Sequence, residues 1–155
     1  MSVSSRLKEL GLTLQPTTPA IGSYVPATVA GSLIFCSGAT CMVDGRPKYR
    51  GKIGREITIE QGNDAARIAA LNMLQKIADV VGDVDRVGGI LKLVGHLNCT
   101  SDFISHAAVV NGASDLLVEI FGDRGRHARL SLGANSLPND VPLEIEVVAF
   151  LAEER

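Results

Sequence analysis

The alternation of hydrophobic and polar residues predicts a strand at the C-terminal end of the chain. The segment Leu143 to Leu151 reads LEIEVVAFL. A period of two places one set of side chains on one face of such a strand: Leu143, Ile145, Val147, Ala149 and Leu151. The other face receives Glu144, Glu146, Val148 and Phe150. We expect the first face to pack against helices. The second is too apolar to be wholly solvated and too charged for a closed core, so it fits a subunit interface.

Shorter apolar runs predict the other strands. Residues 24–29 and 32–37 are rich in strand-forming residues and flank Gly31, which predicts an early hairpin. Residues 90–97 and 128–133 are further apolar runs. The sequence Leu-Pro-Asn-Asp at 137–140 predicts a turn before the last strand.

A change of period predicts two main helices. Thr58 and Gln61 form a capping box, and the alanine-rich run that follows carries apolar residues to about Val81, before Gly82. The second helical region runs from residues 101–102 to 121–122, with a possible break at 111–112, an Asn-Gly pair. Residues 4–10 predict a short helix opened by a serine cap. We interpret residues 1–19 as an N-terminal extension, followed by a single domain over residues 20–155.

This order of elements predicts an α+β fold of two layers, in which helices cover one face of a sheet. With 155 residues and 46% hydrophobic content, the chain can bury a core without a disulfide or metal. The net charge of −2 is typical of a soluble protein, and no apolar run approaches the ~20 residues of a membrane span. The charged first ten residues do not resemble a secretory signal, so we expect a cytoplasmic protein with no membrane partner.

Composition also limits the chemistry. The three cysteines, Cys36, Cys41 and Cys99, lack the paired spacing of a zinc or redox site, and the three histidines, His96, His106 and His127, show no metal-ligand spacing. We therefore expect reduced thiols and no metal. Four Phe, two Tyr and no Trp leave few platforms for stacking bases, which argues against nucleic acid as a partner.

Basic residues gather in two places. Arg46, Lys48, Arg50 and Lys52 alternate, so an extended segment over residues 45–54 would present all four on one side. A solvated strand edge protected by charge is the expected explanation. Arg124, Arg126 and His127 could raise the potential that draws anions toward Arg129, although a solvated loop explains the two arginines equally well.

Several short motifs, in order, resemble those of the RidA/YjgF family. The closing signature is the most specific: His127-Ala-Arg129, then Leu137-Pro138, then Leu143-Glu144-Ile-Glu146. Earlier pieces are Ile21-Gly22-Ser23-Tyr24, Phe35-Cys-Ser37-Gly38, Asn72 in the first main helix, and Ser101-Asp102-Phe103. The resemblance covers residues 20–150.

The resemblance implies a chorismate-mutase-like fold of the bacillus type, with a mixed sheet, two main helices on one face, and a homotrimer whose sheets enclose a barrel. It also implies a cleft between subunits in which a small reactive enamine or imine carboxylate is hydrolysed, without a cofactor, to a 2-keto acid and ammonia. Matched position by position, Arg129 would hold the substrate carboxylate, Glu144 would orient or activate water, and Tyr24 would lie near the cleft. Ser131 stands where the family more often has cysteine.

Some residues depart from the family pattern. His127 replaces a proline, Ala39 a glutamine, and Ser23 the proline before the tyrosine. The chain is also longer than typical members between residues 103 and 121. Alternation directs His127 and Ser131 to the same side as Arg129, so we include both among the candidate substrate-binding residues. Such departures can reshape the cleft, so the sequence leaves the substrate open.

Each candidate has a structural alternative. Arg129 suits a bidentate clamp on a carboxylate, but it could instead form an ion pair with Glu144 or Glu146. Glu144 could act as a base toward water or be a solvated glutamate, and Tyr24 could donate from its hydroxyl or simply pack. Besides a deaminase, we consider a non-catalytic module that binds a carboxylate metabolite, and an endoribonuclease, which the acidic composition disfavours. Both of the first two need Arg129, but only the enzyme needs Glu144.

Overall fold

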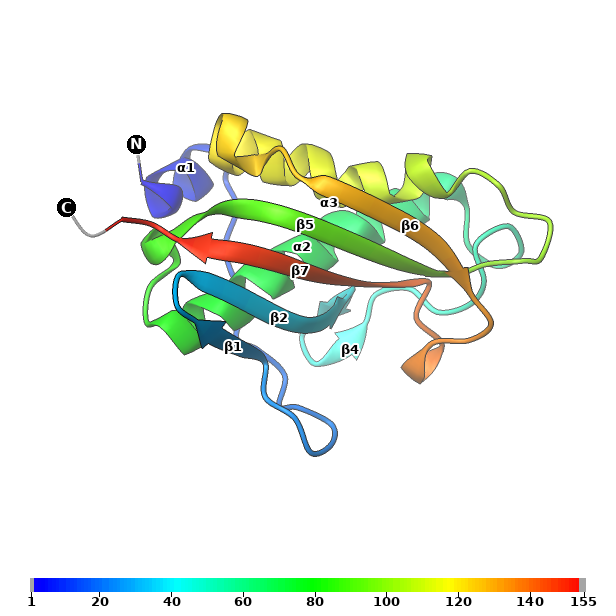
Figure 1. Cartoon of the computed structure of the whole chain (residues 1–155). Helices are drawn as coiled ribbons and strands as arrows, with labels where there is room; N and C mark the ends of the chain where they lie inside the picture. Colours follow the sequence, from blue (N-terminus) through cyan, green and yellow to red (C-terminus); the bar gives the residue numbers. More distant parts are fainter. Residues whose placement is uncertain (1, 154–155) are drawn as a thin grey trace.

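The computed structural model describes residues 2–153 and contains one mixed five-stranded sheet (Figure 1). The sheet order is β1 (Ala27–Ala30), β2 (Leu33–Thr40), β7 (Leu143–Leu151), β5 (Val87–Asn98) and β6 (Ala128–Ala134). β5 and β6 run parallel, and the other neighbours run antiparallel. The α+β class, the early hairpin and the strands at residues 90–97, 128–133 and 143–151 are confirmed.

Two long helices cover one face of this sheet and leave the other face open (Figure 1). They are α2 (Ile59–Val81) and α3 (His106–Phe121). The smaller elements are the helix α1 (Val3–Glu9), the short 3₁₀ turns η1 (Val84–Arg86), η2 (Gly122–Gly125) and η3 (Pro138–Asp140), and a hairpin of β3 (Met42–Val43) and β4 (Arg46–Pro47). Within residues 2–153, no helix has the length and apolar character needed to cross a bilayer.

The N-terminal end of α2 forms as its sequence predicts. The Thr58 hydroxyl accepts from the Gln61 backbone N–H, and the Gln61 side chain accepts from the Thr58 N–H. The helix ends at Gly82, whose φ of 91° suits glycine. Four buried alanines give α2 a thin face, which lets it approach the sheet and α3 closely: Ala65, Ala66, Ala69 and Ala70.

α3 differs from its prediction in two ways. It begins at His106 and not near residue 101, because Thr100 is tied to Ile53 by a backbone hydrogen bond and Phe103 closes a turn back onto Thr100. It also passes through 111–112 without a break. A side chain at Gly112 would collide with the backbone carbonyl of Asn63, so this glycine permits close packing of α3 on α2.

The basic segment 45–54 is not one extended strand. β4 ends at Pro47, and the chain then turns at Gly51 and Gly54, whose φ angles are 115° and 91°. Ile53 is fully buried and bridges to Cys99. The prediction that four basic side chains share one solvated side is therefore wrong, because the chain turns at Gly51 and the Lys52 ammonium contacts Asn98 and Asn135.

The two faces of the sheet differ as the alternation in β7 predicts. The largest fully buried side chains lie between sheet and helices: Ile34, Ile53, Met73, Leu74, Ile77, Ile90, Leu93, Leu97, Leu116, Leu117, Leu143 and Ile145. α1 adds Val3 and Leu7 to this core, and the backbone N–H and hydroxyl of Ser4 both donate to the carboxylate of Asp85. The N-terminal helix is therefore packed on the domain.

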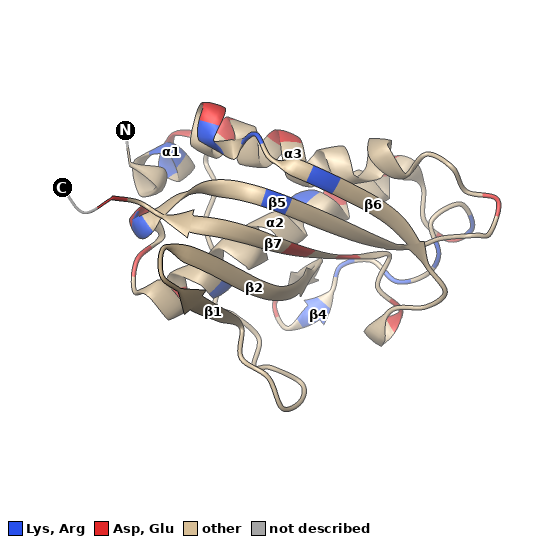
Figure 2. Cartoon of the chain, in the orientation of Figure 1, with Lys and Arg blue, Asp and Glu red and all other residues tan. Residues whose placement is uncertain are grey.

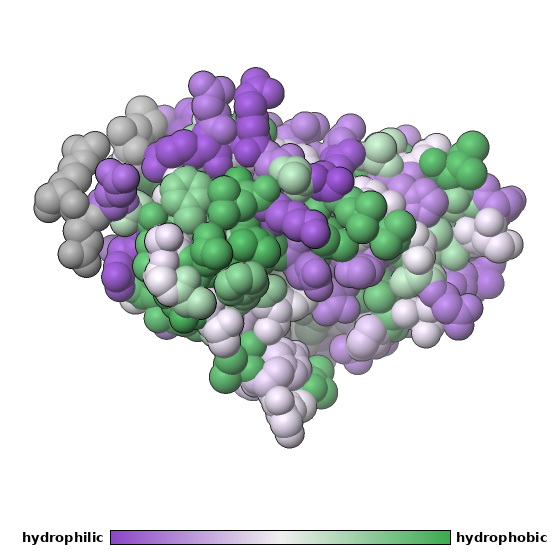
Figure 3. Space-filling view, in the orientation of Figure 1, coloured by the Kyte–Doolittle hydropathy of each residue, from purple (hydrophilic) through white to green (hydrophobic). Residues whose placement is uncertain are grey.

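The open face carries few charges and many apolar side chains (Figures 2 and 3). In Figure 2 the ribbons of β5, β6 and β7 are coloured as charged only over short segments. Phe35, Leu130 and Leu132 keep close to half of their surface exposed, at 45%, 47% and 46%. Cross-strand register adds Val148 beside Phe35 and Phe150 beside Leu33. Such a contiguous apolar face is typical of an interaction surface.

Candidate functional site

A hollow beside the N-terminal end of β7 contains two of the predicted residues, Glu144 and Tyr24. We call it the Glu144 cleft. It encloses about 560 Å³ between the loop of residues 18–26, the end of β2 and the η3 turn. Its lining also includes Ser37, Gly38 and Lys76.

A bulge in β2 fixes the position of Glu144. The register between β2 and β7 shifts between Cys36 and Ala39, so Ser37 and Gly38 lie in the irregular stretch. The carboxyl group of Glu144 occupies the place where a side chain on Gly38 would be. The serine-glycine motif therefore has a physical reason, because any larger residue at 38 would displace Glu144.

Lys76 brings a cation into the same cleft from α2. Its Nζ donates to the carbonyl oxygen of Gly38 at 2.6 Å, a neutral partner. Within residues 2–153, no ion pair involves Lys76. It also lines a second hollow of about 310 Å³ under residues 15–19, which shares Thr40 and Met42 with the Glu144 cleft. The cleft therefore continues past Glu144 beneath the N-terminal segment.

Backbone contacts hold the loop that carries Tyr24. The Ser37 hydroxyl donates to the carbonyl of Val25 at 2.6 Å, and the Ser37 N–H donates to the carbonyl of Pro26 at 2.8 Å. Tyr24 itself is 50% exposed and lies before β1 begins, not within a strand. Tyr24 is thus a half-exposed residue in the lining of the cleft.

The remaining predicted residues gather at the edge strand β6, in what we call the Arg129 cluster. Arg129 Nη1 donates to Asn111 Oδ1 at 2.8 Å and to Ser114 Oγ at 3.1 Å, both on α3. Ser114 Oγ also lies 3.0 Å from His127 Nε2. His127 and Arg129 therefore share one side of the chain, and Ser114 joins them.

The partners of His127 define its neutral tautomer. Its Nδ1 lies 2.6 Å from the carbonyl oxygen of Gly125, which can only accept, so Nδ1 carries a proton. In the neutral ring Nε2 then accepts from the Ser114 hydroxyl, whose lone pairs accept from Arg129. This chain of donors fixes the guanidinium of Arg129 through neutral groups only. Its charge is left for an anion, and the alternative of an ion pair with Glu144 or Glu146 is not found within residues 2–153.

Ser131 lies on the same side of β6 as Arg129. Its Oγ is buried, and it has no hydrogen-bond partner among the residues that the structure describes. A buried hydroxyl without a partner costs free energy and invites an explanation. In the cluster, a ligand or a neighbouring chain could supply the missing contact.

The Glu144 cleft and the Arg129 cluster do not meet within one chain. Arg129 pairs in register with Leu93, which faces the helices, whereas Glu144 pairs with His96 on the open face. β5 separates the two strands, so their backbones lie roughly 10 Å apart. The side chains of Arg129 and Glu144 also point to opposite faces of the sheet. A substrate of a few atoms therefore cannot contact both side chains in a single copy.

Several of these residues were not predicted from the sequence. Lys76, Asn111 and Ser114 give no local signal, because each is a polar residue on a helix whose neighbours bury an apolar face. Gly38 does have a local sequence signal, because it belongs to the serine-glycine pair at the end of β2. Within the described part of the chain, no group of three or more His, Cys, Asp and Glu gathers to hold a metal ion.

Comparison with known proteins identifies relatives over almost the whole chain. Residues 4–153 match the family described as "YjgF/chorismate mutase-like, putative endoribonuclease". Protein TCP17 of Trypanosoma cruzi is 32% identical over 150 residues, covering 96% of this chain and 94% of that protein. The crystal structure of "a putative endoribonuclease" from Shewanella oneidensis is 34% identical with a TM-score of 0.93, covering 97% of this chain and 100% of the other. Escherichia coli TdcF with bound serine is 25% identical with a TM-score of 0.62, covering 88% and 93%.

Proposed function

The chain belongs to the YjgF/chorismate mutase-like family, and we propose that it hydrolyses a small enamine or imine carboxylate, without a cofactor, to a 2-keto acid and ammonia. The reaction would take place where the Glu144 cleft of one copy meets the Arg129 cluster of another. The observation that carries the proposal is the separation of Glu144, on the central strand β7, from Arg129, on the edge strand β6 and the opposite face of the sheet. Only a second copy can bring them together.

The open face supports an assembly. It offers exposed leucines on β6 and phenylalanines on β2 and β7, enough apolar surface to pack against the same face of another copy. We propose a homotrimer, as the family resemblance implies, in which the edge with β6 of one copy lies beside the edge with β1 and β2 of the next. Each assembly would then contain three composite clefts.

Hydrolysis of the C=N bond needs a cation to hold the substrate carboxylate and a group that transfers protons between water and nitrogen. The guanidinium of Arg129, held by Asn111 and Ser114, would bind the substrate carboxylate through its remaining N–H groups. Glu144 would take a proton from water as the oxygen attacks the C=N carbon. It would give that proton to nitrogen, which forms a carbinolamine. A second proton would then pass by way of Glu144 from the carbinolamine hydroxyl to nitrogen, so that the C=O bond forms, the C–N bond breaks and ammonia leaves. Tyr24 would donate a hydrogen bond to the developing oxygen or nitrogen.

A second candidate is a non-catalytic module that binds a carboxylate metabolite in the same composite cleft. The bound serine in the E. coli relative favours it, because serine is itself a small carboxylate. The module needs Arg129 and Lys76 but has no use for a base at Glu144. Release of ammonia above the spontaneous rate distinguishes the two candidates.

The decisive experiment is complementation between two inactive variants. Ammonia release would be measured from a panel of enzymatically generated imino acids, with Arg129→Ala and Glu144→Gln each expected to be inactive. If both are unfolded together and refolded, about a quarter of the clefts in a random trimer combine the intact Arg129 of one copy with the intact Glu144 of the next. Activity near that fraction of wild type is expected.

Two outcomes contradict the proposal. A mixture that stays inactive while forming mixed trimers means that the two residues act in one chain or not at all. If wild type never exceeds the spontaneous rate with any imino acid, the enzyme is excluded and the binding module becomes the better explanation.

A further inference from the structure

A third pocket lies at the C-terminal ends of β5 and β6. It encloses about 600 Å³ and is formed by the turn around Gly51, the segment after β5 and the end of β6. We call it the Cys99 pocket. Among the described residues that line it there are two cations, Lys52 and Arg55, and no carboxylate.

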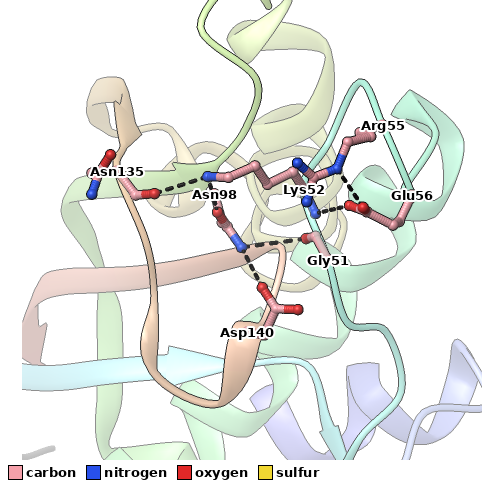
Figure 4. A network of polar contacts seen from close by, with 7 residues as sticks. All are labelled: Gly51, Lys52, Arg55, Glu56, Asn98, Asn135 and Asp140. Atoms are coloured by element: carbon pink, nitrogen blue, oxygen red, sulfur yellow. Dashed lines mark hydrogen bonds and ion pairs between the residues drawn. The ribbon is translucent and has the colours of Figure 1, made fainter.

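Lys52 is held in the pocket by neutral groups (Figure 4). Its Nζ donates to Asn98 Oδ1 at 2.7 Å and to the carbonyl of Asn135 at 2.8 Å. Asn98 is 1% exposed, and its own amide donates to Asp140 Oδ1 at 3.1 Å. A buried amide thus orients the ammonium, which has a third N–H left and no ion pair within residues 2–153.

Other groups add positive potential. Arg55 lines the pocket, although Glu56 pairs with it and offsets part of its charge. α3 begins at His106 on the pocket wall, and the N-cap Ser105 makes no side-chain bond to the first turn. The amide groups of a helix N-terminus carry partial positive charge that favours an anion nearby.

A thiol and an imidazole face this space. Cys99 Sγ lies 3.7 Å from His106 Nε2, and the Phe103 ring holds the imidazole edge-on at a centroid distance of 5.3 Å. A side chain on Gly133 would lie 3.2 Å from the sulfur and 3.4 Å from Nε2. The glycine therefore leaves the thiol open to the pocket. Cys36 and Cys41 are buried in the core.

We propose that the Cys99 pocket binds a small carboxylate or phosphate anion, held by Lys52 and Arg55 with its body against the Cys99 thiol. The site is independent of the imine chemistry, since it shares no residue with the Glu144 cleft or the Arg129 cluster. It would take a ligand of a few heavy atoms with one anionic group. The buried Asn98 explains why an otherwise exposed loop lysine is fixed in place.

The thiol itself is the probe. Cys99 would be alkylated with anionic iodoacetate and with neutral iodoacetamide at about pH 8.5, near the ordinary thiol pKa. Burial raises the pKa of Cys99, and Lys52 opposes this. Because that pKa affects both reagents equally, the ratio of the two rates reports only the attraction of the pocket for an anion.

At Cys99 we expect the ratio of the iodoacetate rate to the iodoacetamide rate to be about fivefold higher than for a neutral model thiol. This is the increase in rate that one positive charge a few ångströms from the anion gives in a water-like medium. Lys52→Met should return the ratio to the model value, and Lys48→Met should not, because Lys48 pairs with Asp64 outside the pocket. If Lys52→Met does not fold, Arg55→Gln at the exposed rim replaces it, with a smaller decrease expected.

Competition identifies the ligand class. Inorganic phosphate and pyruvate, each matched in ionic strength with chloride, should slow alkylation by iodoacetate. Protection by phosphate alone points to a phosphate ligand, and protection by pyruvate to a carboxylate. A ratio equal to that of the model thiol, no protection by either anion, or a Cys99 that neither reagent reaches in the folded protein would each overturn the proposal.

Discussion

The Glu144 cleft and the Arg129 cluster are built in different ways. Loop backbone and an absent side chain shape the cleft: Gly38 makes room for Glu144, and the loop of residues 18–26 has no regular secondary structure. Interlocked side chains from α3 and β6 shape the cluster, with Ser114 between Arg129 and His127. The cluster is therefore preorganised within one chain, whereas the cleft is open to adjustment. Changes in the cleft should alter turnover, and changes in the cluster should alter affinity.

The largest expected effect comes from keeping the two half-sites apart. The Phe150 ring lies over Gly88 and Gly89 on the open face, where a side chain on either glycine would collide with it. Phe150→Asp should place a carboxylate in the proposed subunit interface, at a cost of several kcal/mol. We expect light scattering to give a monomer mass and ammonia release to fall to the spontaneous rate. Phe150→Leu is the matched control, and an unchanged assembly for Phe150→Asp would mean that this face is not the interface.

The next effect belongs to the cleft alone. Glu144→Gln keeps the size of the side chain but removes the basic oxygen, so assembly and 2-keto acid affinity should stay near wild type. General acid–base assistance contributes about 10²–10⁴-fold, and the turnover number should fall by that factor. Single-turnover ammonia release measures it. A variant within about threefold of wild type would transfer the role to Glu146, Tyr24 or the substrate itself.

A smaller loss of turnover tests why the cleft has its shape. Gly38→Ala puts a methyl group where the Glu144 carboxyl lies, so Glu144 must move. A misplacement of about 1 Å can cost 10²-fold in rate. Ser37→Ala separates the two effects, because it loosens the loop that carries Tyr24 by removing the hydroxyl bond to Val25 but does not displace Glu144. If Gly38→Ala retains full activity with a normal melting temperature, the position of Glu144 is not critical.

The sequence predicts the fold better than the site, because the spacing of apolar residues indicates which face of each strand or helix is buried. The apolar residues of β7 recur with a period of two and those of α2 with the period of a helix, so the bounds and faces of both elements and the capping box of α2 follow from the sequence. The predictions were wrong at glycines, because a glycine can interrupt a helix, permit a close contact or form a turn. The sequence at Gly112 indicates a helix break, but this glycine instead lets α3 contact Asn63. Gly51 and Gly54 turn a segment that alternation alone describes as extended.

The site could be predicted only in part for a related reason. Arg129, Glu144 and Tyr24 are found from motifs, but no local pattern says that the first two face opposite sides of the sheet. That fact follows from the register of three strands distant in sequence. Likewise, Asn111 and Ser114 contact Arg129 across 18 and 15 residues, a separation that carries no periodic signal.

In the cluster, a charge-preserving change should weaken binding. Arg129→Lys keeps one cation, but an ammonium cannot contact Asn111 and Ser114 and also present two parallel N–H groups to a carboxylate. The expected loss of pyruvate or 2-oxobutanoate affinity is about 1–3 kcal/mol by calorimetry. Arg126→Lys on the exposed loop should bind as wild type does. Equal affinities for all three proteins would make Arg129 structural.

The smallest effect isolates the preorganisation itself. Ser114→Ala removes the bridge between Arg129 and His127 and leaves Asn111 as the partner of the guanidinium. We expect 2-keto acid affinity to decrease by about 0.5–1.5 kcal/mol, the net value of a hydrogen bond, with the turnover number nearly unchanged. Asp115→Ala, at the exposed neighbouring position, is the control. Because Ser114 acts through Arg129, its effect should vanish in the Arg129→Lys background, as measured by a double-mutant cycle. If the two losses simply add, Ser114 touches the ligand directly, and the cluster is no more preorganised than the cleft.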